Sequence, residues 1–181
     1  MNRAIILDRD GTLNQDDGYT YKVEHFKLLP GVIEGLKLLK DDFIFFIVTN
    51  QSGVARGYYT IEDVHKFNNE LLKVLKDNGI SIKEAYICPH HPDDRCDCRK
   101  PGTKFASEAQ GKYDIDMKNS WVIGDHQWDV EMGINAGCRT IYLLTGHGGK
   151  HRAELEKNKI NPEFIAENLL EAARIIMKEK R

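Results

Sequence analysis

The sequence lacks any long apolar run. No window approaches the roughly 20 apolar residues of a membrane-spanning helix, and no stretch of signal-peptide length follows Arg3. The protein is therefore expected to reside in the cytoplasm and to have no membrane partner. Neither sign of charge dominates, because 26 Lys and Arg residues stand against 28 Asp and Glu residues, for a net charge of -2. Without a basic field, we expect no nucleic-acid partner.

Internal repeats, low-complexity segments and linkers are also missing from the 181 residues. This length supports one full hydrophobic core and is short for two independent domains. We therefore expect residues 1–181 to form a single domain, and the protein to be a monomer.

Cysteine is scarce, with four residues in the chain. One of them, Cys138, stands apart and is expected to be a small buried hydrophobic residue. The other three cluster in one short loop, and in a reducing compartment such clusters favour metal binding over disulfides. They are Cys88, Cys96 and Cys98.

The loop 88–98 also contains histidine. With His90, the three cysteines offer a complete tetrahedral set for a structural Zn²⁺, which leaves no position open for water. Free thiols or a disulfide remain alternatives, and His91 is a rival fourth ligand. A loop this polar cannot bury a core of its own, so a metal would supply the missing stabilisation. Fixing the loop would also fix Arg99 and Lys100, which follow it directly.

Short apolar runs alternate with helical apolar patterns along the chain. This alternation predicts an α/β fold with one right-handed, doubly wound parallel sheet, as in Rossmann-like proteins. The expected strands are 4–7, 43–48, 85–87, 121–123 and 140–144. The expected helices are about 32–41, 60–79, 103–111, 128–136 and 166–178. Residues 15–29 are expected to form a long loop. Residues 145–149 are expected to be a simple glycine-rich connection, with the alternative that 146–149 approach a ligand as a flexible loop.

Polar residues follow four of the predicted strands. Because the carboxyl ends of parallel strands meet at one edge of a sheet, these residues are expected to share a ligand-binding cleft. They are Asp8 and Asp10, Thr49 and Asn50, Arg99 and Lys100, and Asp125 and Asp129. Carboxylates, a hydroxyl and a cation suit phosphoryl transfer, and Mg²⁺ would reconcile the acids with an anionic substrate. Taken alone, the segment 8–11 is equally compatible with a solvated turn.

In this order, the segments DRDGTLN, VTNQSG, RKP and GDxxxD resemble the four motifs of the haloacid dehalogenase (HAD) superfamily of aspartate-dependent phosphohydrolases. Four ordered motifs are far more specific than any one of them. The resemblance spans Asp8 to Gly146 and implies a phosphomonoesterase with a phosphorylated small-molecule substrate. The spacing of the motifs leaves no room for a cap domain, so we expect an open cleft.

The resemblance also implies a role for each matching residue. Asp8 would attack phosphorus and become an aspartyl-phosphate. Asp10 would protonate the leaving oxygen and then deprotonate the attacking water. Thr49 and the Asn50 amide would hold phosphoryl oxygens, which Lys100 would neutralise. The implied Mg²⁺ ligands are Asp8, the Asp10 carbonyl and Asp125, with Asp129 in a supporting position.

The cysteine loop, the segment VTNQSGVARG and the early DGY are similar to those of the D-glycero-D-manno-heptose 1,7-bisphosphate phosphatases and the related histidinol-phosphate phosphatases. The similarity implies zinc ligands at Cys88, His90, Cys96 and Cys98. The implied substrate contacts are Asp16, Asp17, Gly18, Tyr19, Ser52 and Arg99, with Asn50, Gln51 and Arg56 as further candidates. Two positions depart from these families: His126 replaces a frequent lysine, and RKPGT replaces RKPxPG. Both differences bear on which substrate is bound and leave the predicted phosphoryl-transfer reaction unchanged.

A Mg²⁺-dependent sugar-bisphosphate phosphatase, with a heptose bisphosphate as substrate, is the leading hypothesis. Arg56 and Arg99 suit a second phosphate better than the ammonium group of histidinol phosphate, the runner-up substrate. The scaffold also admits a nucleic-acid 3′-phosphatase, which the net charge does not favour. A zinc-stabilised binding module without catalysis would lack the nucleophile or the cation site, yet both are present.

Overall fold

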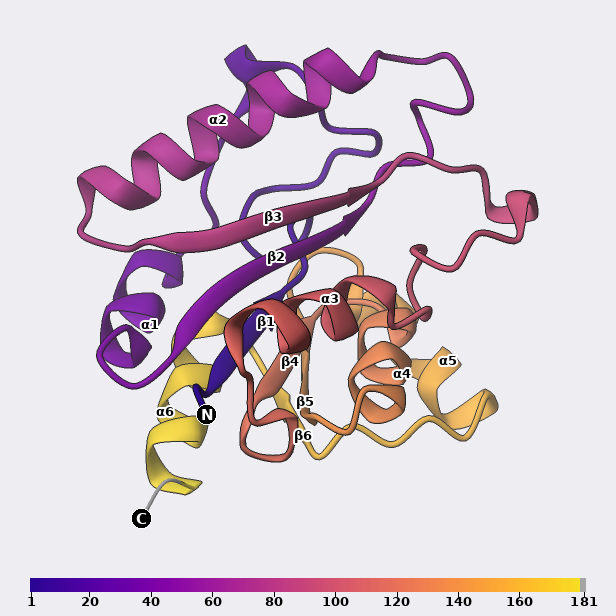
Figure 1. The fold of residues 1–181 in the computed structure, drawn as a ribbon. Coiled ribbons are helices and arrows are strands. Elements are labelled where there is room, and N and C mark those ends of the chain that lie inside the picture. The colour runs from indigo at the N-terminus through magenta and orange to yellow at the C-terminus, as the bar shows by residue number, and fades with distance from the viewer. Residues whose placement is uncertain (180–181) are drawn as a thin grey trace.

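A parallel six-stranded sheet forms the centre of the computed structural model, which describes residues 1–179 (Figure 1). The strands are β1 (Ala4–Leu7), β2 (Ile44–Asn50), β3 (Ile82–Cys88), β4 (Trp121–Gly124), β5 (Arg139–Leu143) and β6 (Phe164–Ala166). Their order across the sheet is β3-β2-β1-β4-β5-β6, and every neighbouring pair is parallel. This doubly wound order confirms the predicted fold class.

Helices cover both faces of the sheet (Figure 1). They are α1 (Val32–Leu39), α2 (Ile61–Asp77), α3 (Lys104–Tyr113), α4 (Gln127–Asn135), α5 (Gly148–Lys157) and α6 (Leu169–Glu179), with short 3-10 turns η1 (Val23–His25), η2 (Pro92–Asp94) and η3 (Met117–Asn119). Ile5 and Leu7 pack in a core with α1, α2 and α6, whereas Ile6 packs in a second core with α3 and α4. Successive β1 side chains therefore point to opposite faces, as expected of a strand buried on both. Cys138 packs, half-buried, against the second core.

Strand order reverses between β1 and β4, where ligands bind in proteins of this architecture. The pairing of β1 with β4 continues one residue past β1, because the Asp8 amide donates to the Ile123 carbonyl at 3.0 Å. Asp8 and Asp125, the residues that follow these two strands, are thereby brought to one edge. The sheet itself positions the predicted site.

Two elements in the C-terminal third were not predicted. Residues 145–149 were expected to be a simple connection, and this is wrong, because α5 begins at Gly148. Its first residues are two glycines, and Leu155 is its one buried large apolar side chain, so the helical pattern is weak in the sequence. The other element, β6, has three residues and extends the sheet beyond β5.

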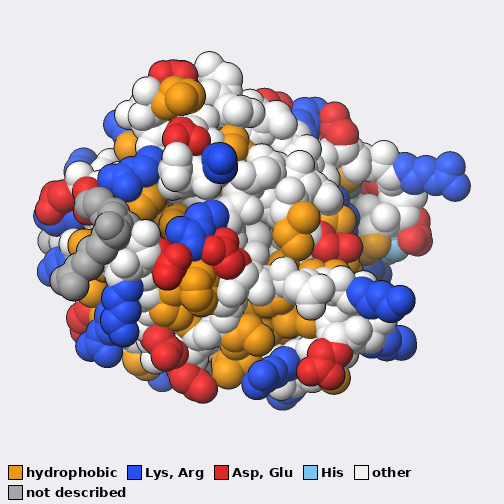
Figure 2. Space-filling view, turned by 90° about the horizontal axis from the view of Figure 1, so that it is seen from below, with side chains coloured by type: hydrophobic (Ala, Val, Ile, Leu, Met, Phe, Trp, Pro, Cys, Tyr) orange, Lys and Arg blue, Asp and Glu red, His pale blue; other side chains and the backbone are white. Residues whose placement is uncertain are grey.

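The face seen from below in Figure 1 mixes acidic, basic and hydrophobic side chains (Figure 2). No area of this face carries charge of a single sign, in keeping with the net charge of -2. Within residues 1–179, no helix is both long and apolar enough to cross a membrane.

Candidate active site

Three carboxylates meet where the strand order reverses. Asp8 follows β1, Asp125 follows β4 and Asp129 lies in the first turn of α4. One oxygen of each lies within 4.8 Å of the others. Gly11 allows this close approach, because it has a φ of +80° and a Cβ there would lie 2.2 Å from Asp125 Oδ2. The sheet and α4 therefore bring the predicted acidic cluster together, and the turn at Gly11 leaves room for it.

The site disfavours the charged forms of Asp8 and Asp125, mainly because both side chains are buried. Burial raises the pKa of Asp8 to about 7, although Lys100 opposes the rise, and Asp129 and Asp10 add to it. Burial likewise raises the pKa of Asp125 to about 9, with further increases from Asp8 and Asp129. A divalent cation would relieve this repulsion, and an all-oxygen donor set is the one that Mg²⁺ prefers. Asp8 and Asp125 thus fit the predicted Mg²⁺ site.

Lys100 lies at the bottom of the cleft and is only 4% exposed. Its Nζ donates to Asp8 Oδ1 at 2.5 Å, to the Val48 carbonyl at 2.8 Å, and forms an ion pair with Asp129 Oδ1 at 2.7 Å. Although burial opposes it, Asp129 and Asp8 raise the pKa of Lys100 above its ordinary value, so the ammonium stays charged. The Asn50 side chain fixes the Lys100 backbone through two hydrogen bonds, of 3.1 and 3.3 Å. Asn50 therefore positions the cation as well as lining the cleft.

Asp10 is held by Arg9, a fully buried arginine that the sequence analysis did not single out. The guanidinium donates to both carboxylate oxygens of Asp10, at 2.7 and 3.0 Å. It also donates to Asn68 Oδ1 and to the Thr20 carbonyl, both at 2.9 Å, and lies 4.6 Å over the Phe67 ring. Two parallel hydrogen bonds fix the direction of a carboxylate as well as its charge. Arg9 therefore orients the predicted acid and base.

Gln51 connects Asp10 to the phosphate-binding side of the cleft. Its Nε2 donates to Asp10 Oδ2 at 2.7 Å and to Thr49 Oγ1 at 2.9 Å. The buried Tyr59 hydroxyl donates to Gln51 Oε1 at 2.7 Å and so fixes the direction of the amide. Burial raises the pKa of Tyr59 to about 12, which keeps this hydroxyl a donor. Tyr59 is a second residue of the site that the sequence analysis missed.

Most of the predicted site residues line a single cleft. They are Asp8, Asp10, Asp16, Tyr19, Thr49, Asn50, Gln51, Ser52, Arg99, Lys100, Asp125 and Asp129. Three predicted substrate contacts, Asp17, Gly18 and Arg56, are exposed and are not among the lining residues. The lining also includes Tyr59, His126, Trp128 and His147.

His147 closes one side of the cleft from the start of α5. Its amide donates to Asp125 Oδ2 at 2.7 Å, and its Nε2 lies 3.0 Å from Asp16 Oδ2. His147 follows β5, and residues that follow parallel strands lie at the same edge of the sheet. Its position after a predicted strand could therefore have indicated that it belongs to the site. The alternative that residues 146–149 approach a ligand therefore describes the position of His147 better than a simple connection does.

Arg99 and Trp128 also line the cleft and lie against each other. The Arg99 guanidinium carbon lies 5.5 Å from the centre of the Trp128 ring. Arg99 Nη1 is buried and has no hydrogen-bond partner within residues 1–179. A buried donor without a partner calls for a ligand or an ion.

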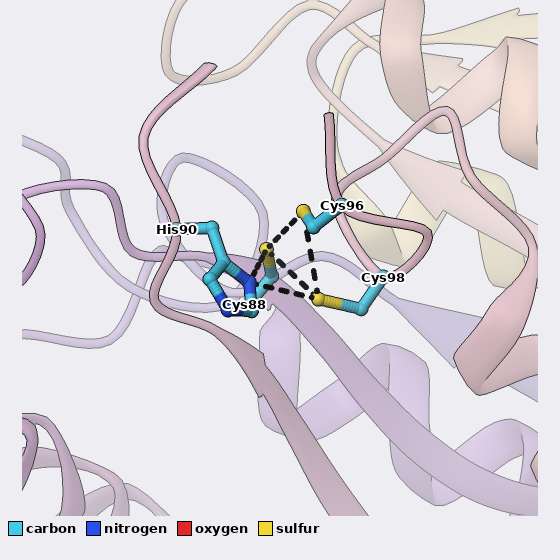
Figure 3. Close-up of side chains that lie close together, drawn as sticks. All are labelled: Cys88, His90, Cys96 and Cys98. Carbon is cyan, nitrogen blue, oxygen red and sulfur yellow. Dashed lines mark hydrogen bonds between the residues drawn. The ribbon is translucent and has the colours of Figure 1, made fainter. Parts of the chain in front are cut away.

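The cysteine loop forms a compact four-membered cluster (Figure 3). Its Sγ–Sγ distances are 3.2–3.7 Å, and His90 Nδ1 lies 3.2 Å from Cys98 Sγ and 3.6 Å from Cys88 Sγ. Tetrahedral zinc with Zn–S bonds of about 2.3 Å would place sulfurs about 3.8 Å apart, so the cluster fits the ion. All four cysteines of the chain are free thiols, which excludes the disulfide alternative in this structure. His91 instead caps η2, where its Nδ1 accepts from the Asp93 amide.

Two family models match the chain. One, described as HAD-hydrolase-like, matches residues 97–172, and the other, described as polynucleotide kinase 3 phosphatase, matches residues 1–132. Together with the doubly wound sheet and the acidic cluster at its edge, these matches define a hydrolase of the haloacid dehalogenase superfamily. The non-catalytic binding module is thereby set aside.

Named relatives indicate which family within the superfamily this chain resembles. D-glycero-beta-D-manno-heptose-1,7-bisphosphate 7-phosphatase from Haemophilus influenzae is 32% identical over the whole of both chains. The corresponding alpha-anomer enzyme from Campylobacter jejuni is 41% identical over 78% of this chain and 82% of its own. The crystal structure of D,D-heptose 1,7-bisphosphate phosphatase from B. bronchiseptica, complexed with magnesium and phosphate, superposes with a TM-score of 0.88 at 31% identity, over 98% of this chain and 99% of that chain. The chain belongs to this family of phosphatases.

Proposed function

We propose that this protein is a Mg²⁺-dependent phosphatase that removes the 7-phosphate of D-glycero-D-manno-heptose 1,7-bisphosphate through an aspartyl-phosphate on Asp8. The observation that carries the proposal is the contact of the buried Lys100 ammonium with Asp8 and Asp129 at the bottom of the cleft. The choice of substrate is supported by relatives, 32–41% identical to this chain, that are named heptose-1,7-bisphosphate 7-phosphatases.

The residues divide the reaction into two steps. Asp8 attacks phosphorus, and the sugar oxygen leaves with a proton from Asp10. Water then gives a proton to Asp10 and attacks the phosphorus, which releases phosphate and restores Asp8. Lys100 and Thr49 stabilise the charge on the phosphoryl oxygens, and a bound Mg²⁺ would supply further charge neutralisation.

Arg99 supports a substrate with two phosphates. Arg99 lines the same cleft as Asp8, and its buried Nη1 has no hydrogen-bond partner in residues 1–179. A second phosphate would satisfy this donor, whereas the ammonium group of histidinol phosphate would be repelled by it. Because Arg56 is exposed, Arg99 alone carries this preference.

We further propose that the cysteine loop binds structural Zn²⁺ through Cys88, His90, Cys96 and Cys98, and that the enzyme is a cytoplasmic monomer. Free thiols in a close cluster suit a reducing compartment. The loop leads into Arg99 and Lys100, so zinc would fix both residues that meet phosphate. Sedimentation at micromolar concentration tests the monomer, because a dimer mass would contradict it.

A phosphate-release assay tests the substrate. The panel is both anomers of the heptose bisphosphate, histidinol phosphate and a 3′-phosphorylated oligonucleotide, the last included because of the polynucleotide kinase 3 phosphatase match. We expect kcat/KM to be highest for one of the heptose bisphosphates. Arg99→Lys should lower kcat/KM for the bisphosphate by about tenfold, because lysine lacks the planar fork, and should leave a monophosphate less affected. Preferred turnover of histidinol phosphate or the oligonucleotide would overturn the substrate assignment.

A further inference from the structure

Three metal-ligating side chains gather outside the predicted set, at the start of α4 and along α5. His126 caps α4, while His151 and Glu154 lie three residues apart on α5 and so share one helix face. One ligand atom from each lies within 4.8 Å of the others. All three residues are half-buried. Two imidazoles and one carboxylate form a donor set that binds zinc and other transition metals.

Each histidine of this cluster has a ring nitrogen to which no hydrogen bond is assigned within residues 1–179. His151 Nδ1 is buried and has no hydrogen-bond partner within residues 1–179, which calls for a ligand. His126 uses Nδ1 to accept from the Trp128 amide at 3.4 Å, so Nε2 remains. The two rings meet edge to face, with centroids 5.4 Å apart and planes at 85°.

The cluster differs in chemistry from both other sites. The carboxylates of Asp8, Asp125 and Asp129 offer only oxygen, which suits Mg²⁺, and the cysteine loop has a closed set of four ligands. This third cluster has three ligands and would leave a fourth position open. Since His126 also lines the cleft, an ion here would lie at its rim.

We propose that His126, His151 and Glu154 form a third cation site, which binds one divalent transition-metal ion at the rim of the cleft. The open coordination position would take water or an oxygen of a molecule in the cleft.

Trp128 provides a direct readout. Its indole stacks on His126, with centroids 4.1 Å apart and planes at 25°. Ni²⁺ quenches nearby indole fluorescence through its unpaired d electrons. Ni²⁺ titrated into the zinc-loaded protein in the presence of Mg²⁺ should therefore quench fluorescence saturably, with one equivalent bound by metal analysis. Trp128→Phe should remove this quenching while Ni²⁺ still binds.

Matched variants separate the site from weaker binding elsewhere. His151→Ala and Glu154→Gln should each weaken Ni²⁺ binding at least about tenfold, because even supporting residues around a metal are worth about 10–100-fold in affinity. The exposed controls His65→Ala and Glu156→Gln should bind as the wild type does. Zinc content should be unchanged in Glu154→Gln, because this residue does not belong to the cysteine loop. Unaltered Ni²⁺ affinity in both site variants, or no saturable binding by the wild type, would overturn the proposal.

Discussion

Replacing Asp125 by asparagine should stabilise the Mg²⁺-free protein and abolish its stabilisation by Mg²⁺. Burial raises the pKa of Asp125 to about 9 in the folded chain, against about 3.9 in an unfolded one. Below pH 4 both states hold the proton. Between pH 4 and 9 the unfolded chain ionises while the folded chain keeps its proton, so stability falls by about 1.4 kcal/mol per pH unit. Asparagine has no proton to lose, so its advantage should grow by about 2–3 kcal/mol from pH 6 to pH 8.

Urea unfolding at these two pH values measures the effect. Mg²⁺ should be removed by gel filtration, because a chelator would also extract zinc from the cysteine loop. The exposed Asp41 provides a control, since Asp41→Asn should change little at either pH. Adding Mg²⁺ should then stabilise the wild type and not Asp125→Asn. If the asparagine variant has the same advantage at pH 6 and pH 8, Asp125 is already ionised without a cation and the reasoning is wrong.

Three further changes test other contacts. Arg9→Lys should lower kcat about 10–100-fold with Mg²⁺ affinity retained, because lysine cannot hold both oxygens of Asp10; unchanged kcat would show that the bidentate contact is dispensable. Lys100→Met should abolish measurable turnover and cost about 3–5 kcal/mol in urea unfolding, since it leaves two buried carboxylates without their cation, whereas the exposed Lys104→Met should do neither. Cys96→Ser should lose the stoichiometric zinc found in the wild type and lower both thermal stability and activity, and a wild type purified without zinc would contradict that assignment.

Most of the central sheet could be predicted because strands such as β1, β2 and β4 are short apolar runs followed by polar residues. Ile5 and Ile6 are both buried, on opposite faces, and this gives an uninterrupted apolar signal. Because parallel strands have their carboxyl ends at one edge of the sheet, the proximity of Asp8 and Asp125 could be predicted before any side-chain contact was known. By contrast, Leu155 is the one large apolar residue of α5, and the role of this helix at the cleft depends on where the sheet places its first turn.

Arg9 and Tyr59 were not predicted to belong to the site, and the physical reason is the same for both. Both residues act through other side chains. Asp10 is adjacent to Arg9 in the sequence, but adjacency does not reveal that the two side chains form two hydrogen bonds. Asn68, which accepts from Arg9, is 59 positions away in the sequence. Arginine between two aspartates is usually a solvated residue, and here it is fully buried. Contacts of this kind depend on how α2 packs, which a local pattern does not specify.

Trapping the covalent intermediate tests the central claim most directly. Borohydride added during turnover reduces an aspartyl-phosphate to homoserine, which peptide mass spectrometry can locate. We predict homoserine at position 8, more of it in Asp10→Asn because the intermediate should hydrolyse more slowly, and neither homoserine nor turnover in Asp8→Asn. Rapid turnover with Asp8 unmodified, or turnover retained in Asp8→Asn, would contradict the account.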